Sequence, residues 1–193
     1  MTDRNQKKVS SLGPISSRRF ATKLDKICTE ERLVNPKVLR KVIELAIEIS
    51  REGREGRKIG TMFVVGDESA VIACSKELIL DPLFGHPPAK KHITDPNMRE
   101  TIKELAQLDG AFIISDNGIV LSAARYIETN SKNIRLPLGL GSRHLAAASI
   151  SLETNAVAVV VSESSVVRIV DDGEIIAEII PELWLIERTN AAS

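Results

Sequence analysis

The chain has 193 residues, of which 43% are hydrophobic, and its 26 basic residues balance 26 acidic residues. This length suits one domain with its own core, and the zero net charge gives no reason to expect a nucleic acid as partner. No segment approaches the roughly 18 apolar residues of a membrane span, and the N-terminus lacks the apolar centre of a secretory signal. We therefore expect a cytoplasmic protein without membrane contact. The isolated Cys28 and Cys74 fit a reducing compartment.

The N-terminal part predicts an irregular lead followed by a long helix. Residues 1–35 mix polar, glycine and proline residues, and we expect one short helix within them, over 20–33. Asn35 followed by Pro36 is typical of a helix start, since an N-cap side chain precedes a proline at the first helical position. Apolar residues then recur at helical spacing as far as Gly53.

Next comes a buried strand and a second helix. The apolar, β-branched run over 60–66 predicts a strand, and 71–73 is its expected strand partner across a polar turn. Asp95 and Pro96 repeat the pattern of cap and proline, which predicts a helix with Asp109 at its C-terminal end.

The remaining elements are mostly strands. Two apolar segments, 111–114 and 119–124, flank Asn117-Gly118, a dipeptide typical of hairpin turns. Three further strands are expected over 156–161, 166–170 and 174–179. Short turns indicate antiparallel neighbours and helical connections allow parallel ones, so we predict an α/β fold in which helices flank a mixed β-sheet.

The segment over 138–151, with sequence LGLGSRHLAAASIS, predicts a phosphate-binding site. A helix that begins there directs free backbone N–H groups and its positive dipole end outward, next to Ser142, Arg143 and His144. Ser142 suits the N-cap position, and the guanidinium of Arg143 can bind two phosphate oxygens. The alternative is that Arg143 and His144 only make local contacts in the first helical turn.

Asp109 precedes a glycine and a predicted buried strand. It could be only the last residue of a helix before a turn, but a carboxylate at the negative end of a helix is unfavourably placed. An acid near a polyphosphate usually holds a divalent cation or takes a proton from an attacking hydroxyl. Together the two segments indicate nucleotide chemistry.

In this order, Asp-Gly-Ala at 109–111 and Gly-Ser-Arg-His at 141–144 resemble the diadenylate cyclase domain, the family that condenses two ATP into cyclic di-AMP. The resemblance runs over about 36–181 and includes the segments 53–57, 60–67 and 161–163. It implies a lead over 1–35, a single diadenylate cyclase-like domain over 36–182 and a tail over 183–193.

The resemblance implies roles for individual residues. The catalytic set is Asp109, Arg143 and His144, with Asp109 handling the ribose 3′-hydroxyl. The cofactor is a divalent metal (Mg²⁺, Mn²⁺ or Co²⁺) with Asp109, His144 and Glu163 as ligands. The implied ATP-binding residues are Gly110, Ala111, Tyr126, Ile127, Gly141, Ser142, Arg143, His144, Ser162 and Glu163. For Tyr126 and Ile127 core packing is the alternative, and for Ser162 and Glu163 a polar turn.

The chain departs from the family's commonest pattern, Arg-His-Arg, because Leu145 stands where the second arginine would be. One positive charge near the triphosphate is therefore missing, unless Leu145 simply packs in the core. Two other functions stay open: a nucleotide-binding sensor of the same fold, and a metal-dependent phosphohydrolase that uses Asp109, His144 and Glu163.

The implied product is symmetric, because the 3′-hydroxyl of each ATP attacks the α-phosphate of the other. One pocket cannot present both nucleotides in this way. We therefore expect a homo-oligomer, at least a dimer whose two sites face each other across a two-fold axis.

Overall fold

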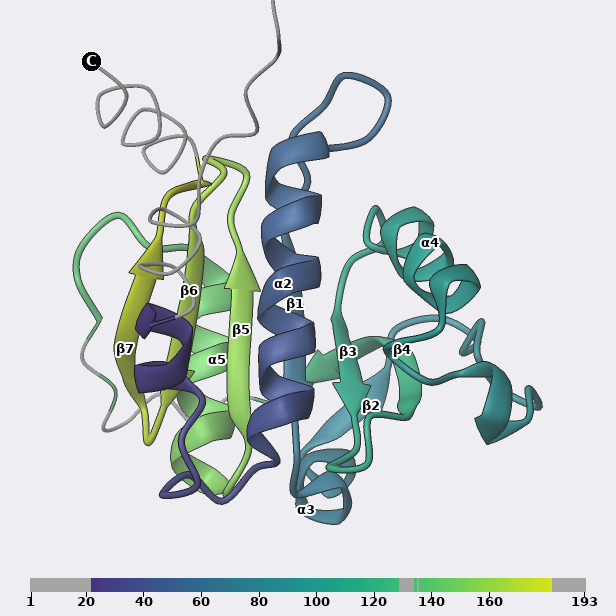
Figure 1. Ribbon diagram of the computed structural model, residues 1–193, viewed down its shortest axis with the longest axis horizontal. Helices are drawn as coiled ribbons and strands as arrows, with labels where there is room; N and C mark the ends of the chain where they lie inside the picture. The colour runs from purple at the N-terminus through teal and green to yellow at the C-terminus, as the bar shows by residue number, and fades with distance from the viewer. Residues whose placement is uncertain (1–21, 129–133, 135, 182–193) are drawn as a thin grey trace, which may run out of the picture.

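The computed structural model describes residues 22–128, 134 and 136–181, and its strands form one mixed seven-stranded sheet with helices on both faces (Figure 1). The strand order is β2-β4-β3-β1-β5-β6-β7. Only the β1–β3 pair is parallel among these strands. The strands are β1 Thr61–Val65, β2 Ser75–Glu77, β3 Ala111–Ile114, β4 Val120–Ile127, β5 Val157–Val161, β6 Val167–Asp171 and β7 Glu174–Ile179. The helices are α2 Pro36–Glu52, α3 Glu68–Ala73, α4 Pro96–Leu105, α5 Ser142–Glu153 and the 3₁₀ turn η1 Pro88–Lys90.

The central strands are buried on both faces. In β1, Phe63 belongs to the core under α2 and Met62 to the core under α5, because successive side chains of a strand point to opposite faces. In Figure 1, α2 lies in front of the sheet and α5 behind it. Coverage on both sides explains why β1 and β5 are apolar without interruption. Residues 22–27 are helical, and Leu24 there is buried in the core under α2.

Both helices predicted from a cap and a proline are confirmed. The Asn35 side chain accepts a hydrogen bond from the Lys37 N–H (3.0 Å), and that of Asp95 accepts one from the Met98 N–H (3.0 Å). However, α4 ends at Leu105, so the prediction that Asp109 stands at the end of this helix is wrong. Asp109 lies in the following turn, and the argument from the helix dipole does not apply to it.

The prediction of a strand over 71–73 is also wrong, because these residues belong to helix α3. Asp67 precedes this helix in a left-handed conformation (φ 43°), and its carboxylate accepts a hydrogen bond from the Asn155 N–H (2.9 Å). The strand that follows is β2, which pairs with β4 at the edge of the sheet. Its sequence, Ser-Lys-Glu, has no apolar alternation that would have predicted a strand.

The strands on the C-terminal side agree with the predictions to within one residue at most bounds. β3 and β4 form the hairpin around Asn117-Gly118, although β4 continues three residues beyond the predicted end, to Ile127. β5, β6 and β7 follow as successive antiparallel neighbours. In the described part of the chain, no helix combines the length and apolarity needed to cross a bilayer.

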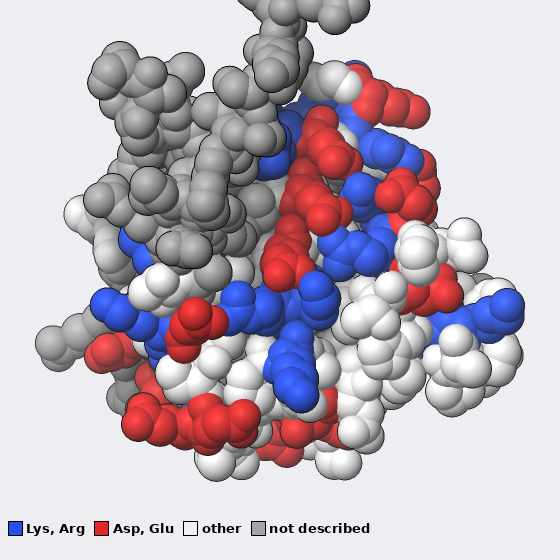
Figure 2. All heavy atoms as spheres, viewed as in Figure 1, with Lys and Arg blue, Asp and Glu red and all other residues white. Residues whose placement is uncertain are grey.

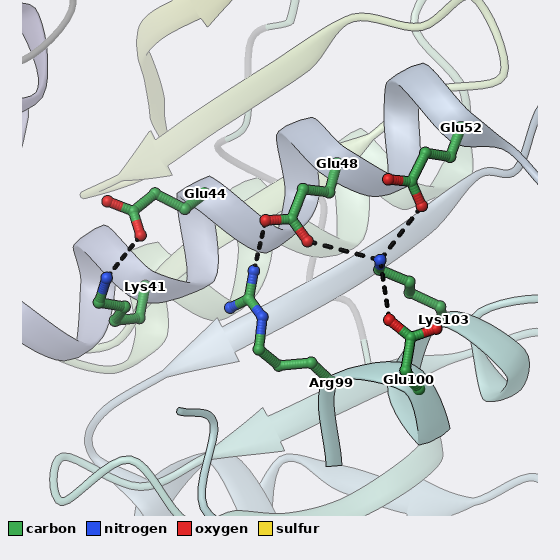
Figure 3. A network of polar contacts seen from close by, with 7 residues as sticks. All are labelled: Lys41, Glu44, Glu48, Glu52, Arg99, Glu100 and Lys103. Atoms are coloured by element: carbon green, nitrogen blue, oxygen red, sulfur yellow. Dashed lines mark hydrogen bonds and ion pairs between the residues drawn. The ribbon is translucent and has the colours of Figure 1, made fainter. Parts of the chain in front are cut away.

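A charged network joins α2 to α4 on the face shown in Figure 2, where acidic side chains run along α2 beside basic ones. The Lys103 Nζ of α4 lies 3.1 Å from Glu52, 3.6 Å from Glu48 and 3.1 Å from Glu100 (Figure 3). Arg99 of α4 contacts Glu48 at 2.7 Å. These contacts hold α4, and so the turn that follows it, against the main body of the domain.

Candidate active site

A cavity of about 380 Å³ opens at the start of α5. It is lined by residues 139–144, by residues 160–164 at the end of β5, and by Arg168 of β6. Its volume falls within the range typical of small-molecule sites. The predicted phosphate-binding segment therefore forms one wall of a cavity.

The helix α5 begins at Ser142, with Gly141 as its N-cap and no side chain capping it. Ser142 is thus the first helical residue, so the prediction that it occupies the N-cap position is wrong. Glycine tolerates this position because it adds no bulk in front of the helix. The His144 N–H donates to the Gly141 carbonyl (3.0 Å), whereas among the described residues the N–H groups of Ser142 and Arg143 have no hydrogen-bond partner and are available to an anion.

Arg143 brings together three segments that are distant in the sequence. Its Nη2 lies 2.9 Å from Asp109 Oδ1 and its Nη1 lies 3.5 Å from Glu163 Oε1. The side chains of Asp109 and Glu163 are 87% and 72% exposed, whereas that of Arg143 is 32% exposed. The structure therefore gathers the predicted acid, arginine and second carboxylate at one place, with both carboxylates open to solvent.

The glycine before β1 leaves room for this arrangement. A Cβ added to Gly60 would lie 2.8 Å from Arg143 Nη1 and 3.2 Å from Glu163 Cγ. Sequence reasoning predicted Gly60 only as the start of a strand and missed this contact. Nothing local marks it, since the close approach depends on how β1 and β5 pair.

His144 is buried, with 6% of its surface exposed. Its Nε2 lies 3.2 Å from Arg168 Nη1, and because arginine can only donate, Nε2 accepts and the proton of a neutral ring belongs on Nδ1. Burial, followed by the charges of Arg168 and Arg143, lowers the pKa of His144, while Glu178 opposes this shift. Nδ1 is buried without a partner among the described residues. His144 is therefore neutral at pH 7.

The predicted metal ligands do not all fit one ion. The described residues contain no group of three His, Cys, Asp or Glu side chains suited to a metal. The Nε2 of His144 faces a guanidinium, which excludes a cation at that atom in this arrangement. The exposed carboxylates of Asp109 and Glu163 do fit, because Mg²⁺ is commonly held by one or two carboxylates together with the phosphates of a substrate.

The turn between Asp109 and β3 is tightly packed against β4. Gly110 has φ +99°, and a Cβ there would lie 2.7 Å from the carbonyl carbon of Ala124, which itself has φ +53°. Only glycine fits such a close approach at positive φ. Ala111 is fully buried and pairs with Arg125. Gly110 therefore fixes the position of Asp109 relative to the start of β3.

Tyr126 and Ile127, the predicted adenine contacts, lie at the end of β4 and do not line this cavity. Ile127 is 2% exposed and belongs to the core under α5, as the core-packing alternative describes. Tyr126 is 44% exposed, and Lys76 Nζ lies 5.1 Å from the centre of its ring. Tyr126 therefore presents an accessible aromatic ring, whereas Ile127 is part of the core.

Two polar residues of the cavity, Ser164 and Arg168, were not predicted as site residues. Ser164 sits beside the predicted pair Ser162 and Glu163. Arg168 lies inside a strand, where its sequence context VRIV gives only one signal, a charged residue among apolar ones. Leu145 is partly buried.

The two cysteines are remote from this chemistry. Both are free thiols, and neither lines the cavity. Burial raises the pKa of Cys28 to about 11 and also raises that of Cys74. Since the thiolate is the reactive form, burial suppresses the reactivity of both residues.

Comparison with known proteins adds the family. A family model described as DisA bacterial checkpoint controller nucleotide-binding matches residues 48–175. A Methanocaldococcus jannaschii protein named diadenylate cyclase is 52% identical over 146 residues, which are 75% of this chain and 46% of that protein. A Haloferax volcanii protein of the same name is 42% identical over 153 residues, 78% of this chain and 55% of that protein. The chain thus spans about half the length of these relatives.

Solved structures support the fold. DacA from Staphylococcus aureus superposes with a TM-score of 0.50 at 22% identity, covering 81% of this chain and 93% of that one. A hypothetical membrane spanning protein from Bacillus cereus superposes with a TM-score of 0.51 at 20% identity, covering 83% and 87%. The mixed sheet flanked by helices is therefore a fold already observed in other proteins.

Proposed function

The chain belongs to the DisA bacterial checkpoint controller nucleotide-binding family, and from this premise we propose that it condenses two ATP into cyclic di-AMP and two pyrophosphate. The names of the two relatives support this activity. The observation that carries it here is the placement of Arg143 between Asp109 and Glu163 at the start of a helix, beside a cavity of ligand size. ATP as substrate makes the cytoplasm the expected location.

In each half-reaction the ribose 3′-oxygen of one ATP forms a bond to the α-phosphorus of the other. The bond to pyrophosphate breaks, and the hydroxyl proton leaves toward Asp109, which polarises the hydroxyl. The N–H groups at the start of α5 and the guanidinium of Arg143 bind the phosphate oxygens as negative charge redistributes. Arg143 must exchange its carboxylate partners for phosphate to do so.

Asp109 and Glu163 are the residues that would hold a divalent cation. When bound, Mg²⁺, Mn²⁺ or Co²⁺ supplies neutralisation of phosphate charge. We assign His144 to the phosphate-binding wall of the cavity rather than to the metal, because its Nε2 accepts from Arg168. Gly141 and Ser142 lie in the same wall, and Ser162 lines the cavity from the end of β5.

The product has two-fold symmetry, and each chain offers one start of α5 and one Asp109. The proposal therefore includes a second copy that presents the same site face to face, with the two ATP molecules between them. Neither protomer alone would align both attacking hydroxyls in this scheme.

The first test is incubation of the purified chain with ATP and each of the three metals, followed by mass analysis of the nucleotides. We expect cyclic di-AMP and pyrophosphate. Asp109→Asn should still bind ATP and make no product, since the amide cannot accept the hydroxyl proton. ATP bound without conversion would indicate a sensor instead, and ADP or AMP would indicate a phosphohydrolase.

A further inference from the structure

Arg168 occupies a position where a charge is costly. It lies on β6 opposite Val160 of β5, and two residues before Val170, which faces the same side. Both valines are fully buried in the core under α5. The side chain of Arg168 is only 14% exposed. A guanidinium placed here loses much of its hydration and requires partners.

Two side chains contact different nitrogen atoms of this guanidinium. Glu178 stands directly opposite on β7 and accepts from Arg168 Nε at 2.7 Å. His144 Nε2 accepts from Nη1 at 3.2 Å. Among the described residues neither contact uses Nη2. The Nη2 donors therefore remain available to a ligand, and Arg168 lines the cavity at the start of α5.

We propose that Arg168 is a second phosphate-binding arginine of this cavity, held in place by Glu178 and by the neutral ring of His144. The inference rests on the nucleotide binding proposed above. Arg143 lies near the two exposed carboxylates, whereas Arg168 contributes from the wall formed by β5 and β6. The ligand it suits is the phosphate chain of the nucleotide, because a guanidinium presents paired N–H donors that match phosphate oxygens.

The neighbouring residues make this assignment specific. Leu145, which follows His144 on α5, is uncharged and does not line the cavity. The pairing with Glu178 does not use the Nη2 donors, and anion binding by arginine depends on directed hydrogen bonds as well as on net charge. A purely structural Arg168–Glu178 pair would need no cavity beside it, and that is the competing explanation that an experiment has to exclude.

The test compares binding of an unreactive ATP analogue, α,β-methylene-ATP, with binding of adenosine by calorimetry on the full chain with Mg²⁺. Arg168→Met keeps the apolar stem and removes the donors, so the analogue should bind about tenfold more weakly or worse while adenosine stays within about twofold. Arg168→Lys, which keeps the charge without the fork, should fall between. Arg99→Met is the matched control, because Arg99 is also mostly buried (18% exposed) and paired with a glutamate, and does not line this cavity.

A second readout tests the contact with His144. Because the Arg168 charge contributes to lowering the pKa of His144, Arg168→Met should raise that pKa in an NMR titration, whereas Arg99→Met should not. Equal loss of both ligands, no loss of the analogue, or no binding of the analogue by the unmodified chain would each overturn the proposal.

The outcome also separates this inference from the proposed reaction. Binding that depends on Arg168 in a chain that makes no cyclic di-AMP would support the inference and refute the cyclase activity. A chain that makes cyclic di-AMP and binds the analogue equally well with Arg168→Met would do the reverse.

Discussion

His144 makes the stability of the domain depend on pH. Its pKa is lowered from the ordinary histidine value of 6.5 by burial and by Arg168 and Arg143, against the opposing effect of Glu178. Below pH 6.5 the ring of His144 is therefore protonated in the unfolded chain while it stays neutral in the folded chain. As the pH decreases through this range, the free energy of unfolding decreases, until the folded ring is protonated as well. We expect His144→Gln to weaken this dependence between about pH 8 and pH 5.

Urea unfolding of both chains across that range gives the comparison. His86→Gln is the control, because His86 is exposed on the loop before α4. A slope unchanged by His144→Gln would show that the buried ring does not govern acid stability.

At the scale of single residues, the sequence predicted those whose neighbours along the chain carry the signal. Asp109 and Arg143 lie in motifs rich in glycine, and their side chains form an ion pair in the structure. Gly60 and Arg168 were not predicted, because their importance arises from close approach across strands. The N-cap of α5 is Gly141, one residue before the predicted Ser142. Glycine and serine are both common at this position, so the sequence did not distinguish them.

Elements with strong local signals were predicted, and those defined by packing were not. Asn35 and Asp95 mark helix starts because their side chains satisfy N–H groups of the first turn. Residues 71–73 form a short apolar run, a pattern that suits a strand and a helical turn equally well, and only Val71 of the three is buried. The polar edge strand β2 forms because its backbone pairs with β4. The sequence Ser-Lys-Glu alone does not predict this pairing.

The ion-pair network between α2 and α4 is the element-scale feature with a measurable contribution to stability. Lys103 is 12% exposed and contacts Glu48, Glu52 and Glu100, so Lys103→Met leaves three carboxylates without their shared cation (Figure 3). We expect a loss of about 1 kcal/mol in the free energy of unfolding, because these glutamates stay partly hydrated. At about 1 M salt the loss should shrink, since salt screens their repulsion.

Lys41→Met is the matched control on α2, because among the described residues the Lys41 ammonium pairs with Glu44 alone and its side chain is 46% exposed. It should change the free energy of unfolding by less than about 0.5 kcal/mol. Equal effects of the two substitutions would mean that α4 is held by its apolar residues, such as Ile102, and not by charge.

The sheet order determines where the site forms. β1 and β3 run parallel, and β5 lies antiparallel beside β1. The starts of β1 and β3 and the end of β5 therefore lie together at one end of the central strands. Gly60, Asp109 and Glu163 come from these three strand ends, and Arg143 joins them from α5. The order of strands depends on contacts between distant segments. For this reason the sequence predicted a mixed sheet but not which strand ends would lie together.

For the whole molecule, the proposed reaction makes activity a property of pairs of chains. If each pair needs Asp109 from both members, mixing the unmodified chain with an equal amount of Asp109→Asn at constant total protein should leave about a quarter of the activity, because about one pair in four has both acids. Activity per chain should also rise with protein concentration while pairs are incomplete. Half the activity at equal mixing, with no dependence on concentration, would instead mean that each chain completes the reaction alone.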